Sequence, residues 1–229
     1  MLVSVIIPTF KEGLEIESFL KRLVRAFPDW QTILVDGNSR DGTVEQAHLA
    51  GVDDVLECEP SRGAQMKLGA DYAKGKLLLF LHADSHLSEE AGAMLEGVAR
   101  RGGKAWGAFR LRHNIPEGAG FLMRFLLGTA DWRSKGNRIP YGDQGIFCTR
   151  EAFEACGGMP EQALMEDIEF ACRLRKVSAM IRLPATLRGS GRRFLGRPFR
   201  SSLCWHSFPI LYRLGVSPER LARWYGHAR

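Results

Sequence analysis

The sequence predicts an α/β domain with a mainly parallel central sheet and helices on its faces. Short apolar runs alternate with amphipathic stretches over the first hundred residues, as happens when strands and crossover helices follow one another. Residues 77–81 are apolar throughout, which is typical of a strand buried on both faces of a parallel sheet. The chain has 229 residues, of which 45% are hydrophobic and 25% charged, so it can build a core without disulfides or structural metals.

In the first half of the chain, strand and helix signals follow one another in order. Residues 2–7 form a β-branched apolar run that stops at Pro8, and residues 14–27 place their apolar side chains on one helical face. The predicted strands of this half are residues 2–7, 32–35, 55–57 and 77–81, and its predicted helices are residues 14–27, a segment from about Thr43, and residues 62–74.

The second half of the chain is less regular, and it alternates less clearly. Its predicted strands are residues 105–113, 145–149 and 180–183. Its predicted helices are residues 121–127, 166–176, 203–214 and a last one that begins at Pro218, with Ser217 as its N-cap.

Polar residues follow three of the predicted strands, at the point where each strand ends. They are Pro8–Thr9–Phe10, Asp36–Gly37–Asn38 and His82–Ala83–Asp84. Because open parallel sheets bind ligands beyond the carboxyl ends of their strands, the sequence predicts a ligand site at this edge. The first strand is followed by neither G-x-G-x-x-G nor a Walker loop, which argues against a dinucleotide or P-loop site.

Three carboxylate positions each allow a structural and a functional interpretation. Asp36 is either a turn residue or the acceptor of a nucleobase N–H at the strand end. Asp84 is either a turn aspartate or a ligand of Mg²⁺ or Mn²⁺, which use one or two carboxylates together with diphosphate oxygens. Glu166 and Asp167 either complement the dipole of their helix, or Asp167 is a general base beside an acceptor hydroxyl.

Positive charge is concentrated at the C-terminal end of the chain. The net charge is +6, but nine arginines and one acid, Glu219, follow residue 187 and give that segment +8. This imbalance predicts an anionic partner, for which phosphate, an anionic membrane surface and nucleic acid are the candidates. The segment also contains Phe, Trp and Tyr residues among its arginines, a mixture that suits a membrane surface if the rings do not simply complete the core.

The cysteines and the apolar segments bear on where the protein works. The chain has five cysteines and no C-x-x-C pair, which indicates reduced thiols and argues against a zinc site. No apolar stretch approaches the roughly 20 residues of a membrane-spanning helix, and the N-terminal run lacks the basic flank of a signal peptide. We therefore expect a cytoplasmic protein.

The motifs taken together resemble glycosyltransferase family 2. The segments that carry the resemblance, in order along residues 3–176, are SVIIPTFKE, ILVDGNSRDGT, RGAQM, LLLFLHADS, GIFCTREAFEACGGMPE and MEDIEFACRLR. The later segment YRLGVSPERLARWY resembles the subfamily known as radical-SAM/selenodomain-associated transferase 2. Each segment alone is a weak signal, whereas their order and spacing are specific.

The resemblance implies a GT-A fold, a three-layer α/β sandwich that merges a nucleotide-sugar half with an acceptor half. By this division residues 1–104 bind the donor, residues 105–187 bind the acceptor, and residues 188–229 form a basic helical extension packed on the domain. The residues that the resemblance assigns to the nucleotide sugar are Pro8, Thr9, Glu12, Asp36, Arg62, His82 and Asp84.

The resemblance also implies an activity and its catalytic groups. It predicts a metal-assisted, inverting, hexosyltransferase-like enzyme that uses a UDP- or GDP-sugar, with Asp167 as the base and Asp84 as the metal ligand. Asp143 is a second carboxylate candidate, either as the base or as a group that binds acceptor hydroxyls. The predicted acceptor-binding residues are Trp132, Gln144 and Glu166, although Trp132 is about as often a core residue as a sugar-stacking one.

One residue departs from the family pattern. His82 stands where the family usually has the first aspartate of its D-x-D motif. Imidazole can still bond a ribose hydroxyl, and its nitrogen suits Mn²⁺ better than Mg²⁺. His82 also favours a competing hypothesis, a catalytically inactive nucleotide-sugar-binding protein on the same fold.

A second competing hypothesis is a basic module that binds nucleic acid or a membrane. The arginine-rich segment supports it, but residues 1–187 sum to −2 and the segment has no lysine. We therefore expect no nucleic-acid partner, and we expect peripheral contact with the inner face of a membrane as a route to a lipid-linked acceptor.

Overall fold

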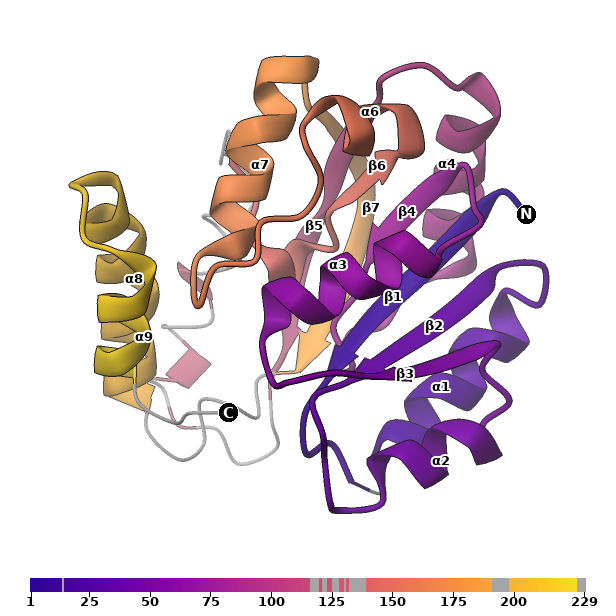
Figure 1. Ribbon diagram of the computed structural model, residues 1–229, viewed down its shortest axis with the longest axis horizontal. Helices are drawn as coiled ribbons and strands as arrows, with labels where there is room; N and C mark the ends of the chain where they lie inside the picture. Colours follow the sequence, from indigo (N-terminus) through magenta and orange to yellow (C-terminus); the bar gives the residue numbers. More distant parts are fainter. Residues whose placement is uncertain are drawn as a thin grey trace.

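Figure 1 shows the computed structural model of the protein. The structure describes residues 1–13, 15–115, 120, 123–124, 128–129, 131, 139–190 and 198–225. Its elements, in chain order, are β1 (Val3–Thr9), α1 (Glu15–Ala26), β2 (Gln31–Asp36), α2 (Thr43–Leu49), β3 (Asp54–Glu57), α3 (Arg62–Tyr72), β4 (Leu77–Phe80), α4 (Glu89–Arg101), β5 (Trp106–Asn114), the 3-10 helix η1 (Gly142–Gln144), β6 (Phe147–Thr149), α6 (Arg150–Ala155), α7 (Glu166–Val177), β7 (Ile181–Ser190), α8 (Pro198–Arg213) and α9 (Pro218–Tyr225).

Seven strands form one sheet in the order β3-β2-β1-β4-β6-β5-β7. Strands β3, β2, β1 and β4 run parallel, and β7 runs parallel to β5. Only β6 is antiparallel to its neighbours among these strands. The predicted mainly parallel sheet is therefore confirmed, and the carboxyl ends of β1, β2, β4, β5 and β7 share one edge.

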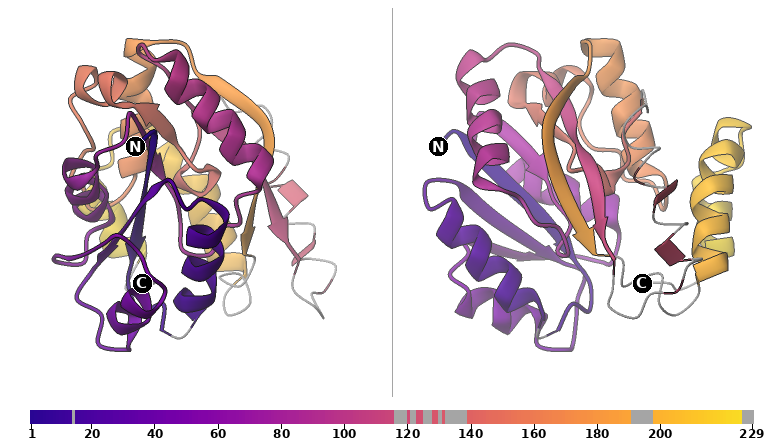
Figure 2. Two further views of the ribbon diagram at one scale, coloured as in Figure 1. Left: turned by 90° about the vertical axis from the view of Figure 1, so that its right-hand side faces the viewer. Right: turned by 180° about the vertical axis from the view of Figure 1, so that it is seen from behind.

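Helices cover both faces of this sheet, which gives three layers (Figures 1 and 2). Side chains alternate along each strand, so Leu77 and Leu79 of β4 join one core and Leu78 and Phe80 join the other. The first core packs against α1, α2 and α4, and the second packs against α3, α6 and α7. Burial on both faces explains why residues 77–81 are apolar without interruption.

The sequence predictions of the first half hold to within a few residues, while the second half differs. Two helices were not among the predicted elements: α4 in the first half and α6 in the second. Strand β7 continues from the predicted segment 180–183 to Ser190 and so crosses the predicted boundary at residue 187. Most of the predicted helix 121–127 lies outside the described residues.

Helices α8 and α9 pack against the domain beside the start of α7. Their buried residues Cys204, Phe208 and Leu221 contact a group that includes Leu164 and Met165. Ser217 caps α9 as predicted, because its Oγ accepts the N–H of Arg220 at 3.3 Å. Within the residues that the structure describes, no helix is both long enough and apolar enough to cross a membrane.

Candidate functional site

The ends of β1 and β2 are joined at the carboxyl edge of the sheet. The parallel register places Thr9 opposite Asp36, and Thr9 Oγ1 donates to Asp36 Oδ1 at 2.9 Å. Ser39 donates its N–H to Asp36 Oδ2 at 2.6 Å and its hydroxyl to Oδ1 at 2.8 Å. Asp36 is fully buried. The carboxylate therefore organises its own turn, and its predicted contact with a nucleobase stays a prediction.

The loop after β1 is held by the loop after β2. Lys11 donates its N–H to Ser39 Oγ at 2.8 Å, and the N–H groups of Glu12 and Gly13 both lie 3.1 Å from Thr43 Oγ1. Pro8, on the β1 side of this loop, is half-buried. The predicted nucleoside residues thus lie at the ends of β1 (Pro8, Thr9) and β2 (Asp36) and in the loop after β1 (Glu12), and hydrogen bonds join these segments.

Gln65 of α3 is a site residue that the sequence analysis missed. Its side chain is buried, and its Nε2 donates to Thr9 O at 2.7 Å and to Val35 O at 2.8 Å. It therefore fixes the start of α3 against the ends of both strands. The only signal was Gln65 itself, one of two polar residues in RGAQM, and its partners are 30 and 56 residues away along the chain.

Backbone strain is also concentrated at this edge. Among the described residues other than glycine, only Lys11, Asn38 and Met165 have a positive φ, at 56°, 57° and 65°. Lys11 follows β1, Asn38 follows β2, and Met165 immediately precedes α7. Such conformations cost free energy and cluster at ligand and active sites, so they mark these three loops as functional candidates.

Asp167, Gly142 and His82 converge from three separate segments. Gly142 donates its N–H to Asp167 Oδ2 at 2.7 Å, and Ile168 donates its own to Oδ1 at 2.7 Å. A β-carbon added to Gly142 would lie 3.1 Å from His82 Nε2 and 3.4 Å from Asp167 Oδ2. The absence of a side chain at position 142 therefore lets the imidazole and the carboxylate approach the same point.

Arg62, at the start of α3, lies among the carboxylates of this region. Its Nη1 is 3.5 Å from Glu166 Oε1, and 37% of its side chain is exposed against 3% for Glu166. Burial of Arg62 opposes its charge, but Glu166, Asp167 and Asp143 outweigh this and raise the pKa of its guanidinium above its ordinary value. The structure thus brings together four of the residues that the sequence analysis chose separately.

The predicted acceptor residues have different positions. Gln144 is 1% exposed; its Nε2 donates to Phe109 O at 3.1 Å and its Oε1 accepts the Tyr141 N–H at 3.2 Å. Gln144 therefore supports the turn that carries Asp143, and both Gln144 and Glu166 would have to be uncovered to contact an acceptor. Trp132 lies outside the described residues.

Asp84 stands half-buried in the turn after β4, two residues after His82. Across the described part of the chain, no three His, Cys, Asp or Glu side chains are grouped so as to hold a metal ion by themselves. A site of one carboxylate fits the way Mg²⁺ is commonly held, by one or two carboxylates, waters and substrate phosphates. The donor set at Asp84 is thus compatible with a metal that arrives together with a diphosphate.

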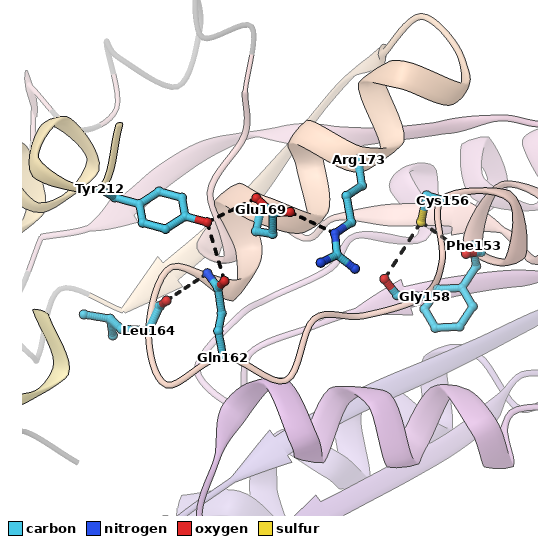
Figure 3. A network of polar contacts seen from close by, with 8 residues as sticks. All are labelled: Phe153, Cys156, Gly158, Gln162, Leu164, Glu169, Arg173 and Tyr212. Atoms are coloured by element: carbon cyan, nitrogen blue, oxygen red, sulfur yellow. Dashed lines mark hydrogen bonds and ion pairs between the residues drawn. The ribbon is translucent and has the colours of Figure 1, made fainter. Parts of the chain in front are cut away.

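Helix α8 is bonded to the helix that carries Asp167. Tyr212 OH donates to Glu169 Oε2 at 3.1 Å and lies 3.5 Å from Gln162 Oε1 (Figure 3). Arg173 Nε donates to Glu169 Oε1 at 2.9 Å, and this bond lowers the pKa of Glu169. Burial in turn raises the pKa of the Tyr212 hydroxyl, so it remains a donor over the physiological range. The network ties the C-terminal helices to α7 next to the site.

Tyr212→Phe is expected to lower the free energy of unfolding by about 1 kcal/mol, the net contribution of an ordinary hydrogen bond, because partial exposure weakens the contact with the charged carboxylate. The melting temperature should then fall by about 2–4 °C. Tyr72→Phe is the matched control, since Tyr72 is 52% exposed at the end of α3. Equal melting temperatures for the two variants would contradict an anchoring role for Tyr212.

Comparison with known proteins gives a family match and several structural likenesses. The model of the family described as "Glycosyl transferase family 2" matches residues 4–155. No curated protein matches the chain at a significant level.

Three solved structures share the architecture. The mannosyltransferase PcManGT from Pyrobaculum calidifontis, in complex with GDP-Man and Mn²⁺, is 19% identical, with a TM-score of 0.66 over 99% of this chain and 68% of that one. TarS from S. aureus is 14% identical, with a TM-score of 0.61 over 100% and 71%. Glucosyl-3-phosphoglycerate synthase from Mycobacterium tuberculosis, with Mg²⁺ and UDP, is 17% identical, with a TM-score of 0.55 over 81% and 69%. At these identities the likeness establishes the fold, the predicted GT-A architecture.

Proposed function

Because the chain belongs to glycosyltransferase family 2 and has the GT-A fold, we propose that it transfers a hexose from a nucleoside diphosphate sugar to an acceptor hydroxyl, with inversion at the anomeric carbon. The observation that carries this proposal is the convergence of Asp167, His82 and Arg62 at the carboxyl edge of the sheet. The narrower resemblance to the radical-SAM/selenodomain-associated subfamily stays a prediction, as does a cytoplasmic location.

On the donor side, the joined loops after β1 and β2 receive the nucleoside. Pro8, Thr9 and Glu12 line it, and Asp36, which is fully buried, would have to be uncovered to accept a base N–H with the lone pair that its own turn leaves unused. Structural relatives bound to GDP-Man or UDP-GlcNAc support a UDP- or GDP-sugar as the donor. Arg62 lies among the carboxylates of Glu166, Asp167 and Asp143. Its positive charge would offset part of their negative charge when an anionic diphosphate enters the site.

On the acceptor side, Asp167 removes the proton of the attacking hydroxyl as the new glycosidic bond forms. The anomeric centre passes through an oxocarbenium-like state, so the base is needed while the bond to the diphosphate breaks. The N–H groups of Gly142 and Ile168 fix both oxygens of Asp167 and so orient the carboxylate. Asp143, next to Gly142, binds acceptor hydroxyls or serves as the base in place of Asp167.

Asp84 would hold a divalent metal together with the donor diphosphate, with His82 nearby on the same turn. When bound, the ion would act as a Lewis acid that offsets the charge developing on the leaving diphosphate. The imidazole of His82 favours Mn²⁺ over Mg²⁺ in this position.

A thermal-shift screen of UDP- and GDP-sugars with Mn²⁺ or Mg²⁺, followed by an assay of donor hydrolysis, tests the proposal. A true donor at a hundredfold excess over its Kd should add about 2.7 kcal/mol to the free energy of unfolding, and it should be hydrolysed slowly even without an acceptor. Adenosine diphosphate sugars serve as the control ligands.

Other outcomes would favour the competing functions. Binding of a nucleotide sugar without any hydrolysis or transfer would identify an inactive binding protein, which the substitution at His82 makes the second candidate. Binding of nucleic acid with a steep salt dependence, and no response to nucleotide sugars, would replace the transferase by a nucleic-acid-binding function.

A further inference from the structure

Helix α8 has an exposed apolar row on the side away from the domain. Leu203, Ile210 and Leu214 are exposed by 69%, 57% and 76%. Leu203 and Ile210 lie seven residues apart on one side of α8, and Leu214 immediately follows the helix, four residues after Ile210. Cys204 and Phe208, on the opposite side, are buried against the domain. We call Leu203, Ile210 and Leu214 the α8 row.

Basic and aromatic side chains accompany the α8 row. Arg213 at the end of α8 and Arg220 and Arg223 of α9 are exposed. Trp224 of α9 is 50% exposed, with the Arg220 guanidinium 5.8 Å from its ring centroid. The segment from residue 188 onward has a net charge of +8 and a single acid. An apolar row of about 16 Å, at 1.5 Å per residue, is therefore accompanied by three exposed guanidinium groups on α8 and α9.

We propose that the α8 row and the neighbouring arginines form a docking surface for an anionic lipid membrane. The leucine and isoleucine side chains enter the boundary between headgroups and acyl chains, while the guanidinium groups remain at the level of the lipid phosphates. The exposed indole of Trp224 suits the same interface, because its ring is apolar and its N–H polar. Helices α8 and α9 lie side by side at one end of the molecule's longest dimension, which gives a flat surface access to them (Figures 1 and 2).

The charge of this surface decides between a membrane and other occupants. Two copies facing each other through the α8 row would bring the exposed Arg213, Arg220 and Arg223 of one copy toward those of the other, and like charges across an interface are unfavourable. An anionic bilayer instead attracts each of these cations when it lies near the bilayer surface. The acyl region also takes up the apolar side chains that the domain leaves exposed.

Docking has a consequence for the proposed function. Because Tyr212 bonds α8 to α7, the membrane would lie close to the edge that carries Asp167, where a lipid-linked acceptor would be presented. This consequence rests on the proposed transferase activity, whereas the docking itself does not.

Flotation of the full chain with lipid vesicles tests the docking directly. The protein should float with vesicles of phosphatidylcholine mixed with phosphatidylglycerol, less at high salt, and stay at the bottom with phosphatidylcholine alone. Leu203→Ser/Ile210→Ser should lower the partition coefficient by about tenfold or more, since two apolar side chains no longer leave water. Arg213→Glu/Arg223→Glu should lower it by a similar factor through charge alone.

The matched control is Leu49→Ser/Tyr72→Ser, which removes two apolar side chains exposed by 67% and 52% on α2 and α3. It should float like the parent protein. Absence of flotation at low salt, equal loss in the control, or self-association that the α8-row variant abolishes would overturn the proposal. Because flotation needs no donor or acceptor, its failure is distinct from failure of the transferase proposal, and melting temperatures show that each variant is folded.

Discussion

Asp167→Asn is expected to lower turnover by about 10²–10⁴-fold, the usual contribution of a positioned general base. The amide cannot accept the acceptor proton, whereas the donor makes no proposed contact with this side chain. Affinity for the nucleotide sugar should therefore change little, and the loss should appear in kcat. Steady-state kinetics with the donor found by thermal shift, together with a direct binding measurement, separate the two parameters.

The local geometry makes a structural control necessary. Asp167 accepts N–H groups from Gly142 and Ile168, and an asparagine oxygen can keep only one of these bonds with its full strength. The melting temperature of the variant is therefore measured as well. A loss of turnover is assigned to the missing base only if this temperature stays near that of the parent. Asp143→Asn is the comparison variant, because Asp143 lies beside Gly142. If Asp167→Asn keeps its activity and Asp143→Asn loses it, Asp143 is the base.

Asp84→Ala is expected to lower turnover by about 10³-fold, because charge stabilisation by a metal at a leaving group is worth several kcal/mol and each 1.36 kcal/mol is a factor of ten. The variant should also lose the increase in UDP affinity that Mn²⁺ gives the parent protein. Calorimetric titration of UDP with and without Mn²⁺ measures this second effect independently of activity.

Asp29→Ala is the matched control for Asp84→Ala. Asp29 is an exposed aspartate in the loop before β2, at the opposite edge of the sheet. It should leave both turnover and the effect of Mn²⁺ unchanged. An Asp84→Ala variant that binds UDP as tightly in Mn²⁺ as the parent does would remove Asp84 from the metal site.

The elements that the sequence analysis placed well are those whose local pattern agrees with their burial. Residues 77–81 are apolar because β4 is covered on both faces, and α1 follows a 3.6-residue apolar pattern against one core. The predicted strand at residues 180–183 stops before Pro184, whereas β7 continues through this proline to Ser190. β7 is an edge strand with an irregular register opposite Ala108 and Arg110, and edges and bulges tolerate proline.

Helix α4 was missed although its local signals are present. Ser88 caps it, accepting the Ala91 N–H at 3.2 Å, and Glu89 and Glu90 occupy its first turn. The cap and first turn of α4 follow the polar turn of His82 and Asp84 within a few residues, so polar residues predominate from the end of the turn into the helix. α6, of six residues, is too short for an apolar period to be recognised.

The sequence by itself determined the α/β class, the parallel first half and the polar residues that follow strands β1, β2 and β4. These are local properties, because a strand end and a turn are each determined by a few consecutive residues. The tertiary structure alone decided which distant groups meet: Gln65 with the ends of two strands, Gly142 with Asp167, and Arg62 with Glu166. The members of such pairs are separated by 25 to more than 100 residues of chain. Whether they meet depends on sheet order and helix packing, which a local sequence pattern does not specify.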